Sequence, residues 1–153
     1  MALVIEIDDP RRSDVAVLLE VHLRTMHEVT PPGGVHALDA DGLAGTDVSF
    51  YSARRDGELV AVGALQDLGE GHGELKSMHV VADERGSGVG RELLEHLLAV
   101  AIVRGFVRLS IETGNTDDFV AARRLYASAG FEVCEPFGPY VDSPTSTCMT
   151  LEL

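Results

Sequence analysis

The stretch Arg85-Gly86-Ser87-Gly88-Val89-Gly90-Arg91 decides the fold, because it joins a strand to a helix. The apolar run Glu74–Val81 before it is typical of a strand. Val89–Val103 after it is apolar on most sides, which predicts a largely buried helix. The first N–H groups of a helix have no partner within the helix, and glycines let a phosphate approach them closely. The stretch therefore predicts a backbone site for an anion, to which Arg85 and Arg91 add positive charge.

Three known phosphate-binding patterns compete for this loop. A P-loop needs Lys-Ser/Thr after its second glycine, and none follows here. A dinucleotide fingerprint, GxGxxG, fits Gly86 and Gly88, and Glu112 lies near the spacing of its ribose carboxylate, but Arg91 stands at the third glycine. The third pattern, [Q/R]xxGx[G/A], is matched in full by Arg85-x-x-Gly88-x-Gly90. A nucleotide-dependent oxidoreductase therefore stays only as a weaker alternative.

The chain on the N-terminal side of the loop reads as a strand, two helices and a meander. Asp56-Gly57 between two β-rich runs predicts a hairpin. We expect strands over Leu3–Ile7, Val48–Arg54, Leu59–Leu68 and Glu74–Val81, a helix from Asp9-Pro10 that ends at Pro31-Pro32-Gly33-Gly34, and a short helix over 35–43.

The chain on the C-terminal side continues with a strand over Val107–Glu112, parallel to the strand before the buried helix. A helix over Phe119–Ala129 and strands over Phe131–Phe137 and Ser146–Leu153 follow. The order is β-α-α-β-β-β-α-β-α-β-β, and no linker divides it. We therefore expect a single domain over residues 1–153 of the α/β (α+β) class.

Charge and cysteine usage limit the partners. The formal net charge is −13 at pH 7, which repels nucleic acid and anionic membranes and attracts amines.

No apolar run reaches the roughly 18 residues of a membrane span, and the acidic start Met1–Asp9 is no export signal, so the expected location is cytoplasmic. Cys134 and Cys148 lack metal-site spacing and flank a hairpin turn. We expect no metal, and two free thiols that are cross-strand neighbours.

Three motifs together carry a resemblance to a known family. They are Arg85-x-x-Gly88-x-Gly90, Met78-His79-Val80 on the strand before it, and Leu125-Tyr126-Ala-Ser-Ala-Gly130-Phe131. With these motifs and its element order, essentially the whole chain resembles the GNAT superfamily of N-acetyltransferases. The segment 73–140 is similar to a subgroup of uncharacterised bacterial members. The resemblance implies a mixed sheet of about seven strands, splayed between Glu74–Val81 and Val107–Glu112.

The resemblance also implies that acetyl-CoA, or a longer acyl-CoA, lies in that cleft as co-substrate. Its pyrophosphate would rest on the loop formed by Arg85, Gly86, Ser87, Gly88, Val89, Gly90 and Arg91. Its pantothenate arm would pair with the strand at Met78, His79 and Val80. Family members often carry an asparagine at the position of Phe119, and Asn115 is the candidate substitute for that cofactor contact.

Acetyl transfer to an amine requires proton removal from the amine, stabilisation of the oxyanion and protonation of the thiolate. The resemblance places the hydroxyl of Tyr126 near the sulfur as the acid; the alternative is a tyrosine that only packs. Glu74, eleven positions before Arg85, is the expected base, and the alternatives are a solvated or Lys76-paired glutamate. Glu112 is the rival base.

The resemblance places the oxyanion donor at a backbone N–H near His79. The imidazole of His79 either titrates near neutrality or packs, while His22, His27 and His36 are expected on the acceptor side. The expected activity is direct attack on the thioester, in a ternary complex, by a primary amine of a small acceptor. The alternative is an acyl-CoA-binding sensor or partner module that transfers nothing. Exposed terminal strands often pair in this family, so a homodimer is a further expectation.

Overall fold

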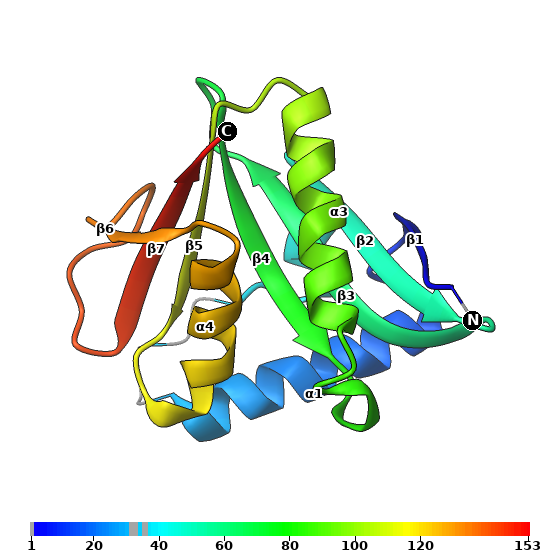
Figure 1. Ribbon diagram of the computed structural model, residues 1–153. Coiled ribbons are helices and arrows are strands. Elements are labelled where there is room, and N and C mark those ends of the chain that lie inside the picture. The colour runs from blue at the N-terminus through cyan, green and yellow to red at the C-terminus, as the bar shows by residue number, and fades with distance from the viewer. Residues whose placement is uncertain (1, 31–33, 35–36) are drawn as a thin grey trace.

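The computed structural model describes residues 2–30, 34 and 37–153. Its centre is a seven-stranded sheet in the order β1-β2-β3-β4-β5-β7-β6, in which only β4 and β5 are parallel (Figure 1). The strands are β1 (Val4–Ile7), β2 (Val48–Arg55), β3 (Glu58–Asp67), β4 (His72–Val80), β5 (Arg108–Gly114), β6 (Glu132–Cys134) and β7 (Ser146–Glu152). This mixed sheet confirms the predicted fold class and element order.

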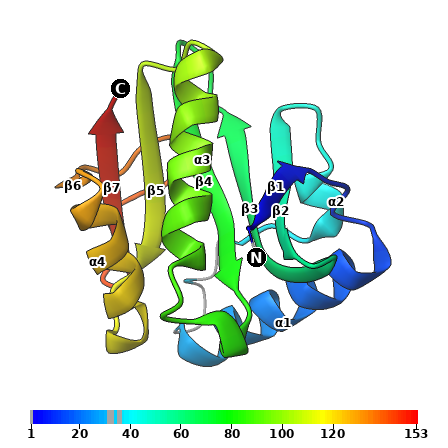
Figure 2. The same ribbon diagram turned by 45° about the vertical axis from the view of Figure 1, so that its right-hand side comes forward.

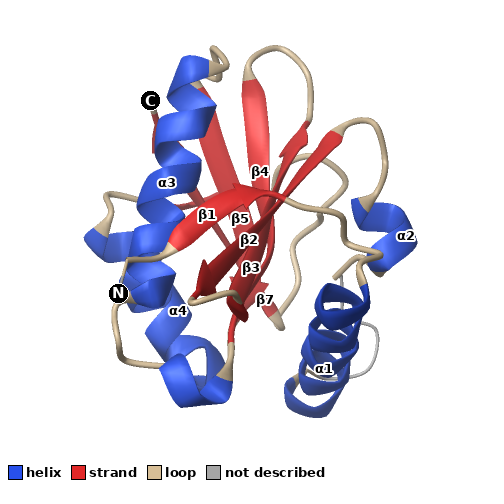
Figure 3. Cartoon of the chain, turned by 90° about the vertical axis from the view of Figure 1, so that its right-hand side faces the viewer, coloured by secondary structure: helices blue, strands red, loops and turns tan. Residues whose placement is uncertain are grey.

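The helices cover both faces of the sheet. They are α1 (Ser13–Val29), α2 (Ala40–Leu43), α3 (Val89–Val103) and α4 (Val120–Ser128), with 3-10 turns at Ala82–Glu84 and Asp117–Phe119. Figures 2 and 3 show α3 and α4 on one face and α1 and α2 on the other. Within the described residues no helix is long and apolar enough to cross a membrane.

Several predicted boundaries differ from the observed ones by a few residues, and three of them have a clear local reason. β6 ends at Cys134 rather than Phe137, since Pro136 has no N–H to continue the ladder. α2 begins only at Ala40, where the Asp39 side chain accepts the Gly42 N–H at 2.8 Å; residues 35 and 36 of that predicted helix lie outside the described residues. α4 begins at Val120, after a 3-10 turn, rather than at residue 119.

Each face of the sheet has its own apolar core. Under α3, the side chains of Leu93, Leu94 and Leu97 pack with Leu75 of β4 and Leu109 of β5. Under α1, a second cluster contains residues from that helix and from β2 and β3: Val15, Leu18, Leu19, Phe50, Val62 and Ala64. The two cores therefore lie on opposite faces of the sheet, and Val81 packs against both. The free cysteines Cys134 and Cys148 are register partners on β6 and β7, as predicted.

β4 contains a bulge at Ser77 and Met78, which together stand opposite Gly63 of β3. The register partners on either side are Val62 with His79 and Ala64 with Lys76. Ser77 has φ 56°, in the left-handed region. Gly63 leaves room for Met78, because a Cβ at this position would lie 2.7 Å from the Met78 sulfur and would force that side chain to move. The bulge thus adds one residue to β4 without a partner on β3.

This extra residue changes which side chains share a face. Lys76 and His79 are three positions apart, yet both face the α1 layer, because their partners on β3 belong to the core under α1. Leu75 and Met78 pack instead against the core under α3. One short segment of β4 therefore presents polar groups to one layer and apolar groups to the other.

β4 and β5 pair over only three residues each, His72–Glu74 with Arg108–Ser110. Beyond Glu74 the two strands diverge, as Figure 1 shows. This confirms the predicted splay of the sheet and leaves one edge of β4 unpaired along the opening.

A charged cluster ties the start of α1 to the sheet. The guanidinium of Arg54 donates to Asp14 at 2.6 Å and to Asp8 at 3.1 Å, and Ser52 Oγ also donates to Asp8 at 2.6 Å. The pKa of Asp14 is lowered chiefly by its hydrogen bond to Arg54. The pKa of Asp8 is lowered because its hydrogen bonds and the charge of Arg54 outweigh the effect of burial, which raises it.

We expect Arg54→Met to lower the free energy of unfolding at pH 7 by about 3 kcal/mol, since it removes the guanidinium that hydrogen-bonds both carboxylates and leaves them only the more distant, exposed guanidinium of Arg12, at 3.6 Å from Asp8 and 3.8 Å from Asp14. Both aspartates have folded pKa values below the unfolded ones, so their contribution is present above about pH 4 and is lost as pH falls through the folded values. Urea unfolding at pH 7 and at pH 3 measures both effects. Arg55→Met, which breaks the more exposed pair with Glu84, is the control and should cost under about 1 kcal/mol. Equal losses for the two variants would contradict this assignment.

Candidate active site

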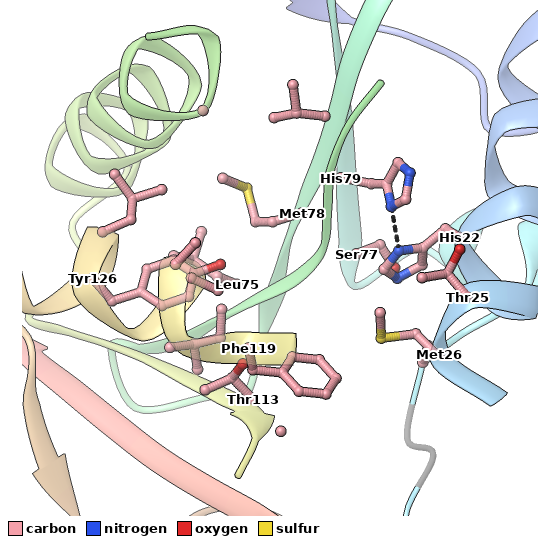
Figure 4. Close-up of a pocket in the computed structure, with 18 of the residues that line it drawn as sticks. His22, Thr25, Met26, Leu75, Ser77, Met78, His79, Thr113, Phe119 and Tyr126 are labelled. Atoms are coloured by element: carbon pink, nitrogen blue, oxygen red, sulfur yellow. Dashed lines mark hydrogen bonds between the residues drawn. The ribbon is translucent and has the colours of Figure 1, made fainter. Parts of the chain in front are cut away.

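A cavity of about 760 Å³ occupies the opening between β4 and β5. It extends from the loop before α3 to the α1 layer, and side chains of both layers line it. Figure 4 shows Tyr126 and Leu75 on one side of it, and His22, Thr25 and Met26 of α1 on the other. The cavity therefore joins the two faces of the molecule at the point where the sheet opens.

The glycine-rich loop forms one end of this cavity. Gly86, Gly88, Gly90 and the two arginines of the motif line it. Gly88 is the N-cap of α3 and has φ 94°, a conformation that favours glycine. The N–H groups of the first turn of α3 have no partners within the helix. Backbone donors at a helix N-terminus and two arginines thus line the same end of the cavity.

Two residues of the predicted cofactor set turn their side chains away from this space. The hydroxyl of Ser87 donates to the Glu84 carbonyl at 2.5 Å, and the Val89 side chain is buried in the core under α3. Only their main chains belong to the loop surface. Arg91 is anchored to Ser128 by a hydrogen bond of 2.8 Å.

The open edge of β4 follows directly from the loop. Val81 N–H donates to Val60 of β3 at 2.9 Å, so Val80 turns its main chain to the opening, and its carbonyl accepts from Arg85 Nε at 3.3 Å. Met78 lines the cavity two residues earlier. His79, like Val81, directs its main chain to β3. The structure thus groups Met78 and Val80 at the open edge and sets His79 apart from them.

Glu74 stands where the strands part, and its side chain is almost fully buried. Its Oε2 accepts from the hydroxyl of Tyr140 at 2.5 Å and from Lys76 Nζ at 3.2 Å. Lys76 Nζ also donates to the Tyr140 oxygen at 3.0 Å. Glu74 is thus paired with Lys76 rather than solvated, and it lies in a buried position on the cavity wall.

Tyr126 points from α4 into the cavity (Figure 4). Its complete burial raises the pKa of the phenol, so the hydroxyl keeps its proton at neutral pH. Within the described residues this hydroxyl makes no hydrogen bond. The group is therefore a proton donor without a protein acceptor, placed across the opening from the α1 layer.

The asparagine expected as a substitute cofactor contact lies outside the cavity. Asn115 donates from its amide nitrogen to the Pro144 carbonyl at 3.2 Å, and its amide oxygen accepts from Thr147 at 2.8 Å. Phe119 lines the cavity instead. Its ring covers Gly114, where a Cβ would lie 2.1 Å from it. The apolar ring of Phe119 thus stands at the position where family members often carry the amide side chain of asparagine.

Two histidines of the α1 face bond to each other. Nδ1 of His22 and Nδ1 of His79 lie 2.9 Å apart (Figure 4). Burial lowers the pKa of each imidazole to about 4, helped by the charge of His79 for His22 and of Arg85 for His79. Both rings are neutral at physiological pH, so His79 does not titrate near neutrality. His27 is exposed and outside the cavity, and His36 lies outside the described residues.

Glu112, the rival base, also lines the cavity, from β5. Its Oε2 accepts a hydrogen bond of 2.5 Å from Ser146 of β7. Sequence reasoning missed Tyr140, because it lies 66 residues after its partner Glu74 in a loop without a motif. Within the described part of the chain no group of three or more His, Cys, Asp or Glu side chains is arranged to hold a metal ion.

A mixed sheet that opens beside a glycine-rich helix N-terminus is the architecture of CoA-dependent acyltransferases, and comparison with known proteins agrees. The model of the acetyltransferase (GNAT) family matches residues 16–131. The chain belongs to the GNAT acetyltransferase family.

Relatives and solved structures extend this result to the whole chain. It is 42% identical over 149 residues to the uncharacterized N-acetyltransferase YsnE of Bacillus subtilis, which covers 97% of this chain and 99% of that protein. A structure from Klebsiella pneumoniae, assigned as an acyl-CoA N-acyltransferase, superposes with a TM-score of 0.80 at 28% identity, covering 99% of this chain and 97% of the other. A Bacillus subtilis acetyltransferase solved with CoA shares the fold, with a TM-score of 0.75 at 19% identity and 99% of both chains covered.

Proposed function

We propose that this protein transfers an acetyl group from acetyl-CoA to a primary amine of a small acceptor, by direct attack in a ternary complex. The observation that carries the proposal is the continuous cavity, which begins at the glycine-rich loop and ends at Glu74 and Tyr126. Such a cavity has room for a donor along one half and an acceptor along the other.

The cofactor half is the loop and the open edge of β4. The pyrophosphate rests on the first amides of α3, between Arg85 and Arg91. The pantothenate arm pairs with the main chain near Met78 and Val80, in the manner of an added strand. CoA, when bound, supplies the activated thioester, and the protein supplies orientation and proton management.

The acceptor half is the face toward α1. Glu74 accepts the proton of the attacking amine and Tyr126 gives its proton to the departing thiolate, so the nitrogen–carbon bond forms as the carbon–sulfur bond breaks. The deep burial of Tyr126 supports this assignment, because it keeps the phenol protonated until negative charge develops on the sulfur.

The test uses the full-length chain and two measurements. Calorimetry measures acetyl-CoA binding, and a thiol reagent detects free CoA when a panel of small amines is added. Binding with amine-dependent thiol release supports a transferase. Binding without release from any amine supports the alternative of a sensor module, and tighter binding of NAD than of acetyl-CoA would exclude both. Longer acyl-CoA donors in the same assay define the acyl group.

A further inference from the structure

The group around Glu74 is held by a chain of aromatic contacts from the loop between β6 and β7. The ring of Phe137 lies 5.6 Å from His72 at the start of β4 and 5.1 Å from the ring of Tyr140. Tyr140 N–H also donates to the Phe137 carbonyl at 3.0 Å. The loop is thereby fixed against β4 at two points, and the Tyr140 hydroxyl reaches Glu74 from a defined direction.

The contacts of the Tyr140 hydroxyl determine which atom donates and which accepts in each hydrogen bond. Lys76 has only donors, so its 3.0 Å contact makes the Tyr140 oxygen an acceptor. The single proton of the phenol is then committed to Glu74 Oε2, at 2.5 Å. Burial and the charge of Glu74 raise the pKa of Tyr140, so this proton stays in place at neutral pH.

The two oxygens of Glu74 are therefore unequal. Oε2 accepts from both Tyr140 and Lys76, whereas within the described residues no hydrogen bond reaches Oε1. A carboxylate oxygen in a cavity has lone pairs that require a donor. Oε1 of Glu74 is thus open to a donor that the described residues do not supply.

The charges beside it indicate the sign of that donor. Glu112 lines the same cavity, and its charge acts on Tyr140. Among the described residues, the cation beside these two carboxylates is the ammonium of Lys76, and the nearby histidine pair is neutral. Arg85 and Arg91 lie at the other end, with the glycine-rich loop. The described residues at the acceptor end therefore carry a net negative charge, which favours a cation.

We propose that Tyr140 is a positioning residue of the acceptor site: with Lys76 it occupies Oε2 of Glu74 and leaves Oε1 to bind the acceptor as an ammonium ion. The proposal rests on the proposed acetyltransferase function and specifies its substrate class as aliphatic amines that are protonated at neutral pH. The ammonium donates to Oε1 and then passes its proton to it. The neutral amine attacks the thioester, the thiolate leaves with the proton of Tyr126, and the second proton that the nitrogen loses as the amide forms returns to the Tyr126 oxygen, while Glu74 releases the first proton to solvent with the products.

The test measures binding apart from turnover. The probes are benzylamine, protonated at pH 7, and benzyl alcohol, its uncharged isostere, added to the full-length protein saturated with CoA and followed by NMR titration. We expect benzylamine to bind and benzyl alcohol to bind at least about tenfold more weakly. Tyr140→Phe should weaken benzylamine binding about tenfold to a hundredfold, the effect of losing a hydrogen bond to a charged group. Its affinity for acetyl-CoA should be unchanged. Tyr51→Phe, a buried tyrosine of β2 outside the cavity, is the matched control.

A double-variant cycle separates positioning from general damage. Glu74→Gln should lose benzylamine binding, and Tyr140→Phe added to it should cause little further loss, because Tyr140 acts through Glu74. With an accepted amine, Tyr140→Phe should raise KM more than it lowers kcat. Additive losses, equal binding of the alcohol, unchanged binding in Tyr140→Phe, or no benzylamine binding at all would each overturn the proposal. All four outcomes leave the transferase assignment standing, which fails instead if the parent protein does not bind acetyl-CoA.

Discussion

Replacing Gly88 with valine is expected to weaken acetyl-CoA binding by at least about a hundredfold while the protein stays folded. Gly88 has φ 94°, and within 4 Å of a Cβ built on it there is no other atom. The new side chain therefore meets nothing in the free protein and fills the space that the pyrophosphate needs at the start of α3. Calorimetry measures the affinity, and thermal unfolding reports the stability.

The chain offers a matched control at the other end of the same helix. Gly105 follows α3 with φ 87°, and a Cβ there also meets nothing within 4 Å. Gly105→Val introduces the same backbone strain, of order 1–3 kcal/mol, far from the glycine-rich loop. The two variants should lose similar stability, and only Gly88→Val should lose acetyl-CoA. If both bind the cofactor equally well, the loop is not its phosphate site.

Tyr126→Phe is expected to lower turnover by roughly tenfold to a thousandfold, at or below the usual contribution of a general acid. Affinity for acetyl-CoA should be nearly unchanged, because the phenylalanine ring keeps the packing against Phe131. The hydroxyl lies in the cavity, bonds to no described residue and stays protonated in its buried position. Removing it leaves the thiolate to depart without a proton donor.

Single-turnover kinetics with an accepted amine are the measurement, since they isolate the chemical step from product release. Tyr51→Phe again controls for the loss of a buried phenol elsewhere. A phenylalanine variant with the parental single-turnover rate would show that Tyr126 only packs in the cavity. The thiolate would then leave unaided.

Local signals predicted the elements that carry the cofactor half. The helix predicted over Val89–Val103 matches α3 at both ends, because Gly88 and Gly105 flank a segment that is apolar on most sides. The hairpin around Asp56-Gly57 and the parallel pair of β4 and β5 were predicted for similar reasons. In these elements the turn residues and the apolar pattern next to them were sufficient for the prediction.

The acceptor half depends on contacts between distant segments, and there prediction was incomplete. Tyr140 reaches Glu74 across 66 positions, and His22 reaches His79 across 57. No spacing rule links such pairs. Asn115 was a reasonable candidate by residue type, but the chain reverses after β5 and commits its amide to Pro144 and Thr147. The Ser77 bulge also lacked a local signal, since serine is not a typical residue at positive φ.

The bulge in β4 makes Ser77 a residue whose loss would leave both faces of the strand unchanged. Deleting it would restore strict alternation, with Lys76 and His79 still toward the α1 layer and Met78 still toward the core under α3. Deleting a residue from the regular part of the strand, such as Leu75, would instead turn the side chains on one side of the deletion to the opposite face, and would exchange polar and apolar groups on both faces at once. A point substitution, by contrast, alters one wall of the cavity and leaves the other intact. Variants designed to use a new acceptor amine should therefore change side chains on the α1 face of β4 and keep the number of residues in the regular part of the strand constant.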